Sequence, residues 1–182
     1  MHNNRKKTFS MINMALSAAF IAVSAQLAIP LPSGIPLTLQ TLAVALCGYL
    51  LGAKLGAISS LVYVALGAMG APVFSGFSGG FHRIVSLTGG FLWGFPLLAL
   101  FCGLSQTQKW SRHEKLYSLL HGTLGVLLCH LCGIIQFSAI SQSNLFTAAL
   151  ISSLPYLLKD AVCVALAYLL SAEIRKRAFT DT

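Results

Sequence analysis

The sequence predicts an all-α integral membrane protein with six transmembrane helices and both termini on the cytoplasmic side. This prediction rests on composition, on six apolar segments and on the placement of the basic residues. Apolar residues make up 56% of the 182 residues and charged residues only 9%, against about 25% charged residues in soluble domains. A soluble fold of this size cannot hide so much apolar surface from water. We therefore exclude a soluble enzyme, a secreted disulfide domain and a disordered tail.

The apolar segments form a single membrane domain over residues 1–182 and run approximately over residues 9–29, 37–51, 55–74, 89–104, 116–140 and 145–170. A transmembrane helix needs about 20 residues. The second, third and fourth segments therefore need their glycine-bearing ends, a tilt or short packing to complete a span. The basic start of the chain resembles a signal peptide, but the long apolar run that follows it favours a retained first helix.

The basic residues predict the orientation of these helices. With the N-terminus in the cytoplasm, ten of the twelve Lys and Arg residues lie inside, Arg83 lies outside and Lys159 lies within the sixth segment. This asymmetry is the positive-inside pattern of membrane proteins. Topology and headgroup contact thus account for the net charge of +8 without a nucleic-acid partner.

Two outer loops differ from the other connections. Residues 30–36 (PLPSGIP) are stiff and irregular, and residues 71–88 (APVFSGFSGGFHRIVSLT) combine glycines with aromatic side chains. Glycine allows close approach to a ligand, and long ordered loops often carry function. Because Val73, Phe74, Phe77 and Phe81 would otherwise be exposed, we expect this loop between the third and fourth helices to be structured and to fold back as a lid.

The sixth segment carries two adjacent opposite charges, Lys159 and Asp160, shortly after Pro155. A charged side chain at the bilayer centre costs about 2.5–3.5 kcal/mol. Helix neighbours point about 100° apart, so these two should not easily neutralise each other. At least one should face a cavity or another helix, and Pro155 frees a backbone carbonyl one turn earlier. We interpret the pair as a functional site; the alternative is a structural pair, such as Asp160 with Arg83.

Arg83 is the only cation that this topology places outside the membrane. An arginine in the lid loop can bind a carboxylate through two parallel hydrogen bonds. His82, which precedes it, is expected to be an ordinary loop residue.

The first helix carries small residues at four-residue spacing, as Ala15 with Ala19 and Ala18 with Ala22. Small residues let membrane helices approach closely. The pattern indicates either internal packing or a docking face for another membrane protein, and from spacing alone both remain open.

No motif predicts catalysis, a metal or a cofactor. The chain has no GxxxxGK[ST] loop for ATP hydrolysis, no HExxH motif and only four acidic residues. The cysteines lie in apolar runs and are interpreted as small hydrophobes. Cys129 and Cys132 form a CxxC, but no second pair completes a zinc site. His121 and His130 lie nearby, and we expect packed, hydrogen-bonded histidines rather than ligands. We do not expect an enzyme.

Four stretches carry more specific patterns: IPLTLQTLAV at 35–44, a glycine-patterned run from 50 to 80 that ends in PVFSGFSGG, TGGFLWGF at 88–95, and a proline–hydrophobic–aspartate element at 155–160. Together they resemble the BioY family, the biotin-binding S components of energy-coupling factor (ECF) transporters. The resemblance extends from about residue 15 to about residue 170.

The resemblance implies an S-component-like helix bundle in the plasma membrane of a prokaryote, with biotin bound near the outer face by helices four to six and the outer loops. It implies high-affinity capture of biotin for ATP-driven uptake. The implied partners are a transmembrane coupling subunit and two cytoplasmic ATPase subunits. The alanine-rich face of the first helix, Ala15, Ala19 and Ala22, is then the face that docks on the coupling subunit.

The chemistry of biotin suggests a role for each candidate residue. Asp160 can accept hydrogen bonds from the ureido N–H groups, and either Arg83 or Lys159 can pair with the carboxylate. Phe74, Phe91 and Tyr156 can wall the apolar part of the ligand. The ureido carbonyl can be bound by side chains or by backbone amides of a further set, Gln40, Thr88, Gly79, Gly80, Gly89 and Gly90.

The chain departs from the family pattern in two places. Ser86-Leu87-Thr88 stands where the family often has Gly-Pro-Thr, and Cys163 stands where many members carry a lysine. The cation that meets the ligand carboxylate therefore stays open. Alternative functions are an S component for another vitamin, such as thiamine or riboflavin, and a stand-alone biotin carrier. A small membrane enzyme and a structural scaffold are less favoured.

Overall fold

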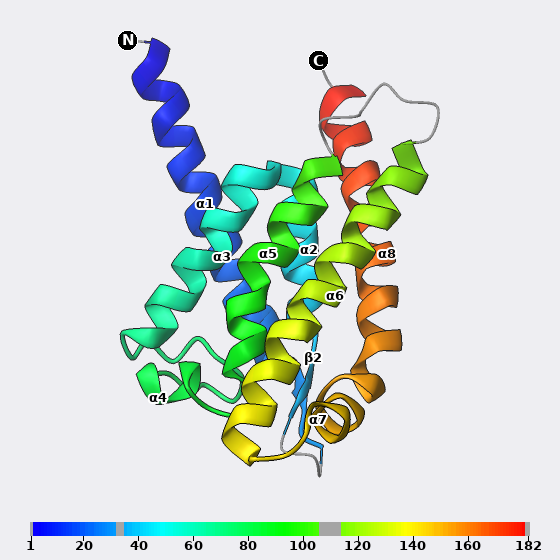
Figure 1. Ribbon diagram of the computed structural model, residues 1–182. Coiled ribbons are helices and arrows are strands. Elements are labelled where there is room, and N and C mark those ends of the chain that lie inside the picture. The colour runs from blue at the N-terminus through cyan, green and yellow to red at the C-terminus, as the bar shows by residue number, and fades with distance from the viewer. Residues whose placement is uncertain (1, 32–34, 106–113, 181–182) are drawn as a thin grey trace.

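The computed structural model describes residues 2–31, 35–105 and 114–180, and nearly all of its regular structure is helical. The helices, labelled in Figure 1, are α1 (His2–Gln26), α2 (Gln40–Leu51), α3 (Ala53–Ala68), α4 (Phe81–Ile84), α5 (Gly89–Leu104), α6 (Glu114–Ser141), α7 (Leu145–Ser152) and α8 (Leu154–Thr180). The predicted all-α fold is confirmed. A short antiparallel hairpin, β1 (Ala28–Ile29) with β2 (Leu37–Thr38), was not expected.

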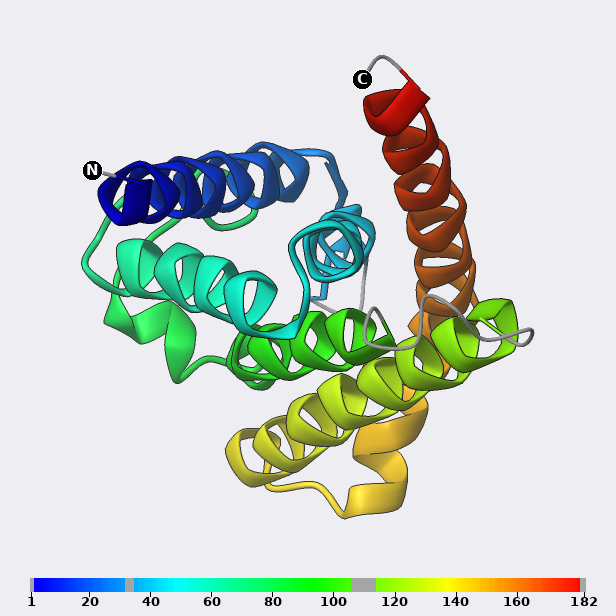
Figure 2. The same cartoon turned by 90° about the horizontal axis from the view of Figure 1, so that it is seen from above.

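The long helices form a bundle whose two ends differ. α4, α7 and the β1–β2 hairpin gather at one end, which we call the hairpin end, and both chain termini lie at the other (Figure 1). Seen from above, α2 lies near the centre, with α1 and α3 on one side and α8 on the other (Figure 2). α2 contacts α1, α3, α5 and α8 and buries nine of its 12 residues. Its apolar sequence suits this central position, since a helix that is apolar all round is a buried helix.

Glycines set the closeness of α5 and α6. A β-carbon at Gly94 would lie 2.6 Å from the Cα of Cys129, and one at Gly90 would overlap the backbone carbonyl of Cys132. On α6, Gly125 packs against Leu98, and Gly133 packs against the ring of Phe91. Small residues at a helix interface allow this close backbone approach, which brings the side chains of α6 up to the centre of the bundle.

The outer faces of the long helices are apolar. Large exposed side chains include Phe20 on α1, Leu127 and Leu131 on α6, and Leu158 and Leu169 on α8. By length and composition, two described helices qualify as membrane spans, Asn4–Gln26 and Glu114–Ser141. α2, α3 and α5 are apolar but shorter, as the sequence analysis expected of these marginal segments.

The main differences from the predicted segments lie in the second, third and sixth. The third segment ends at Ala68 rather than continuing to 74, and the second helix begins at Gln40 because residues 37–38 pair in the hairpin. A continuous helix over 145–170 is wrong: the chain bends at Ser153, between α7 and α8. Proline restricts the residue before it and is tolerated in the first helical turn, which explains why α8 begins at Leu154, immediately before Pro155.

The lid expectation is right for one part of the loop and wrong for another. Phe74 is only 3% exposed, with its ring 5.5 Å from that of Tyr63 in an edge-to-face contact. Phe77 and Phe81, in contrast, are 73% and 65% exposed. Phe74 and Ser78 pair across a tight turn in which Phe77 adopts a φ of 53°, and this turn directs Phe77 away from the core.

The close α5–α6 contact makes a testable prediction. Gly94→Val should lower the thermal unfolding midpoint in detergent, because overpacking of a tight contact costs about 1–3 kcal/mol. Ala139→Val, which enlarges an exposed side chain of α6, is the matched control and should change stability by less than about 0.5 kcal/mol. Equal midpoints for the two variants would contradict this description of the interface.

Candidate functional site

A cavity of about 140 Å³ opens at the hairpin end of the bundle. One water needs roughly 10–15 Å³ on this scale, so the cavity has room for a small organic molecule. Its walls come from the hairpin, the lid loop and the nearby ends of α2, α4, α5 and α8. The lining residues are Ile35, Pro36, Thr38, Gln40, Thr41, Phe74, Ser75, Ser78, Arg83, Thr88, Phe91, Leu92, Phe95, Tyr156, Lys159 and Asp160.

Eight of the twelve substrate-binding residues proposed from the sequence line this one cavity, although they lie far apart along the chain. They are Gln40, Phe74, Arg83, Thr88, Phe91, Tyr156, Lys159 and Asp160. The arrangement is the usual one of a binding pocket, in which aromatic walls surround a few directed polar groups.

The four candidate glycines do not line the cavity. The amide of Gly80 donates to the carbonyl of Gly67 (2.7 Å), and the amide of Gly89 donates to the carbonyl of Ser86 (3.0 Å). A β-carbon at Gly79 would overlap the carbonyl of Ala71. These residues permit close packing of the lid loop and of α5, and their proposed contact with a ligand stays a prediction.

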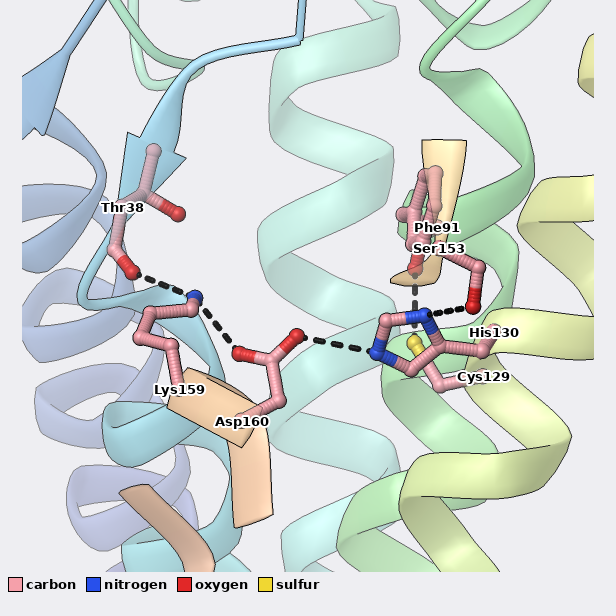
Figure 3. A network of polar contacts seen from close by, with 7 residues as sticks. All are labelled: Thr38, Phe91, Cys129, His130, Ser153, Lys159 and Asp160. Atoms are coloured by element: carbon pink, nitrogen blue, oxygen red, sulfur yellow. Dashed lines mark hydrogen bonds and ion pairs between the residues drawn. The ribbon is translucent and has the colours of Figure 1, made fainter. Parts of the chain in front are cut away.

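Asp160 lies at the polar end of the cavity and is only 6% exposed. Its Oδ1 contacts the Nζ of Lys159 (2.5 Å), and its Oδ2 accepts a hydrogen bond from the Nε2 of His130 on α6 (3.0 Å), as Figure 3 shows. The Nζ of Lys159 also donates to the backbone carbonyl of Thr38 in β2 (2.9 Å). The carboxylate thus joins two helices and, through Lys159, the hairpin.

These contacts confirm one expectation about the charge pair and overturn two others. At least one of the two charges does meet another element. The expectation that neighbours on a helix would not neutralise each other is wrong, because the long lysine side chain bends back to the carboxylate. An Asp160–Arg83 pair is also wrong: among the described residues Asp160 pairs with Lys159 and His130.

His130 is packed and hydrogen-bonded, as expected, but its place at the site was not foreseen. Its Nδ1 lies 2.7 Å from the Oγ of Ser153 (Figure 3), and its ring meets that of Phe91 edge-to-face with centroids 5.5 Å apart. An ionised carboxylate only accepts hydrogen bonds. The network therefore assigns the proton to Nε2, and Nδ1 accepts from the Ser153 hydroxyl.

Gln40 has capacity left for a ligand. Its Oε1 accepts from the Oγ1 of Thr38 (3.0 Å), and its Nε2 donates to the hydroxyl of Tyr63 (2.7 Å). An amide has two N–H donors and two acceptor lone pairs, so one of each remains.

The hydroxyl of Tyr156 donates to the carbonyl of Ile35 (2.7 Å). This hydrogen bond connects α8 to the segment that precedes β2.

Arg83 differs from the buried charges of the site because its side chain is exposed. It belongs to α4 and lines the cavity. Within the described part of the chain it forms no ion pair. Its guanidinium is therefore available to an anionic group. Thr88 is half-buried, and its hydroxyl forms a hydrogen bond with the hydroxyl of Ser86 (3.3 Å).

Gln26, at the last position of α1, holds the lid loop, and the sequence analysis missed it. Its Nε2 donates to the carbonyl of Phe74 (3.2 Å), and its Oε1 accepts from the amide of Phe77 (2.9 Å). One side chain thus satisfies backbone groups on both sides of the tight turn. Polar residues at helix ends are common, so the sequence offers no signal for this contact.

On α1, Ala15 and Ala19 are exposed and Ala22 is half-buried, whereas Ala18 is buried in the core. The small-residue pattern therefore serves both internal packing and an outward face. The proposed docking on a partner stays a prediction.

Comparison with known proteins gives one consistent result. The sequence model of the BioY family matches residues 1–179. A probable biotin transporter BioY of Pyrococcus horikoshii is 35% identical over 162 residues, which is 89% of this chain and 93% of that protein. The biotin transporter BioY of Thermotoga maritima is 33% identical over 166 residues, which is 91% of this chain and 95% of that protein.

The fold leads to the same family. A crystal structure described as the S-component for biotin from an ECF-type ABC transporter superposes with a TM-score of 0.79 at 29% sequence identity, covering 95% of this chain and 94% of that one. Family model, relatives and fold agree over nearly the whole length. The chain belongs to the BioY family.

Proposed function

We propose that this chain is the biotin-binding S component of an ECF-type ABC transporter, which captures biotin at the outer membrane face for uptake driven by partner ATPases. The observation that carries the proposal is the cavity itself, which combines aromatic walls, a buried carboxylate and an exposed arginine. The likeness to a solved S-component for biotin supports it, as do relatives described as biotin transporters.

The charges of the cavity favour biotin over the other vitamins considered. Lys159 already balances the charge of Asp160, so the buried end of the cavity offers hydrogen-bond acceptors without a net negative charge. A neutral ureido group fits such an end, whereas the thiazolium cation of thiamine would lack a counter-charge there. Thiamine and riboflavin also have no carboxylate for Arg83, and biotin does.

These contacts suggest an orientation for the ligand. One ureido N–H donates to Asp160, and the remaining N–H of Gln40 or the hydroxyl of Thr88 serves the ureido carbonyl. The thioether ring and aliphatic chain lie against Phe74, Phe91 and Tyr156. Of the two candidate cations, Arg83 is favoured for the ligand carboxylate, because Lys159 already bonds Asp160 and the carbonyl of Thr38.

The distribution of basic residues supports the outward orientation of the cavity. The N-terminal part of α1, the α2–α3 junction, the start of α6 and the C-terminal part of α8 lie at the end opposite the cavity (Figure 1). Basic residues at these places are Arg5, Lys6, Lys7, Lys54, Lys115, Arg175, Lys176 and Arg177. The positive-inside rule assigns this end to the cytoplasm. Lys109 and Arg112, predicted on the same side, lie outside the described residues.

Coupling to ATP hydrolysis is assigned to other subunits, since the sequence has no phosphate-binding loop of the GxxxxGK[ST] kind. The exposed Ala15 and Ala19 of α1 suit a close helix contact with a transmembrane coupling subunit. Binding energy gained in the cavity must be offset during release, and this is the step that the partner ATPases would drive.

Calorimetry on the purified chain in detergent tests the ligand. We expect tight one-to-one binding of biotin and none of thiamine or riboflavin. Asp160→Asn should weaken biotin binding about 10- to 100-fold, as expected for loss of a charged hydrogen-bond acceptor. Glu173→Gln, which neutralises an exposed acid of the same helix, is the control and should bind as wild type.

Several results would count against the proposal. Folded wild-type protein that ignores biotin would overturn the ligand assignment. Unchanged affinity in Asp160→Asn would overturn the ureido contact alone. Uptake of biotin into liposomes by this chain without any ATPase would favour a stand-alone carrier instead.

The pairing of the ligand carboxylate can be tested with an uncharged analogue. Wild type should prefer biotin to biotin methyl ester, and Arg83→Gln should lose that preference by weakening biotin binding about tenfold while leaving ester binding unchanged. His82→Gln, a change at the adjacent exposed position, should keep the preference. If Arg83→Gln also keeps it and Lys159→Met removes it, the carboxylate lies at Lys159.

A further inference from the structure

We infer that His130, with Ser153 behind it, is the positioning residue of the binding site and holds the Asp160 carboxylate in the orientation that receives the ligand. The inference rests on the proposed function, since it concerns how Asp160 is prepared for a ureido group. It assigns a role to two residues that do not line the cavity within the described part of the chain.

His130 acts through Asp160 and not on the ligand. It belongs to α6, is only 3% exposed and lies behind the carboxylate, on the far side from Lys159 (Figure 3). The tight α5–α6 packing at Gly94 and Cys129 brings this part of α6 inward. A buried imidazole at this place gives the carboxylate a directed donor.

Lys159 and His130 approach different oxygens of Asp160. An ionised carboxylate offers about four lone-pair sites; Lys159 takes one on Oδ1 and His130 takes one on Oδ2, and the side chain of Thr41 also bonds the carboxylate. About one site therefore remains for a ligand donor. The ammonium is held by a flexible four-carbon chain, so without His130 the carboxylate would be free to rotate and bring Oδ2 to Lys159 as well. The histidine opposes that rotation from a different helix.

Ser153 supports the imidazole from its other nitrogen. Its hydroxyl lies 2.7 Å from Nδ1 and donates there, while the carboxylate of Asp160, which only accepts, keeps the imidazole proton on Nε2. The opposite tautomer would present a lone pair to the carboxylate. Ser153 itself occupies the bend between α7 and α8. The bend between the two helices therefore brings this hydroxyl to the imidazole.

Phe91 completes the support. Its ring meets the imidazole edge-to-face at an interplanar angle of 89°, and the same phenylalanine lines the cavity. Contacts on Nδ1, on Nε2 and on the ring restrict the imidazole in three directions. A site that binds a small ligand tightly benefits from such fixed supporting contacts, because less side-chain freedom is lost on binding.

Two amide variants separate positioning from packing. The side chain of glutamine reaches as far as Nε2 of histidine and can donate to Asp160. That of asparagine reaches only as far as Nδ1 and can bond Ser153 but not Asp160. We expect His130→Gln to bind biotin within about threefold of wild type and His130→Asn to bind at least about tenfold more weakly. In an Asp160→Asn background the two should bind alike.

A second pair of variants keeps the inference testable if neither His130 variant folds. Ser153→Ala removes the hydroxyl that bonds Nδ1 of His130 and should weaken biotin binding about two- to fivefold. Ser152→Ala removes a buried hydroxyl that bonds only the carbonyl of Ala148 among the contacts described, and should bind as wild type.

The outcomes distinguish this inference from the proposed function. Equal affinities for His130→Gln and His130→Asn, or for Ser153→Ala and Ser152→Ala, would overturn the positioning role while wild-type biotin binding left the proposed function intact. Failure of folded wild-type protein to bind biotin would overturn both.

Discussion

The burial of one carboxylate constrains much of this structure. An ionised aspartate inside an apolar bundle is unstable unless its charge is balanced and its oxygens are bonded. Asp160 meets both conditions through Lys159 on its own helix and His130 on α6. These partners in turn need Thr38 of the hairpin and Ser153 of the α7–α8 bend. The polar end of the cavity is therefore determined by the requirements of Asp160.

Hydrogen bonds extend this constraint to the lid. The carbonyl of Thr38 holds Lys159 while its hydroxyl bonds Gln40, and Gln40 bonds Tyr63. The ring of Tyr63 supports that of Phe74, whose carbonyl is held by Gln26 of α1. A chain of contacts thus links α8, which carries the charge, to α1, which carries the small exposed residues. A wall connected by such contacts suits a site that is formed before its ligand arrives.

Patterns with a direct physical cause could be predicted from the sequence. Apolar segments between polar or glycine-rich turns indicated the main helices. The rule that a charge in the membrane needs a reason singled out Lys159 and Asp160, and the predicted topology singled out Arg83 as the one cation outside. Tertiary contacts could not be predicted in this way. The partner of His130 lies 30 residues further along the chain, and that of Gln26 lies about 50 residues away, so neither leaves a local signal.

One error came from applying a sound rule too simply. The direction of neighbouring side chains on a helix was used for Lys159 and Asp160, but the reach of a lysine exceeds that separation. The ligand contact predicted for the glycines stays a prediction, but packing already explains three of them: at Gly79, Gly89 and Gly90 a β-carbon would collide with other backbone. Sequence alone does not distinguish a glycine that admits a ligand from one that admits a helix.

The central claim is that Asp160, prepared by Lys159 and His130, receives the ureido end of biotin while Arg83 receives the carboxylate. A crystal structure of the chain with bound biotin, in which the anomalous signal of the thioether sulfur fixes the ligand's orientation, tests this most directly. The account predicts a ureido nitrogen within hydrogen-bonding distance of Asp160 and the carboxylate near Arg83. The reverse orientation, with the carboxylate at Lys159 and no ureido contact to Asp160, would contradict it.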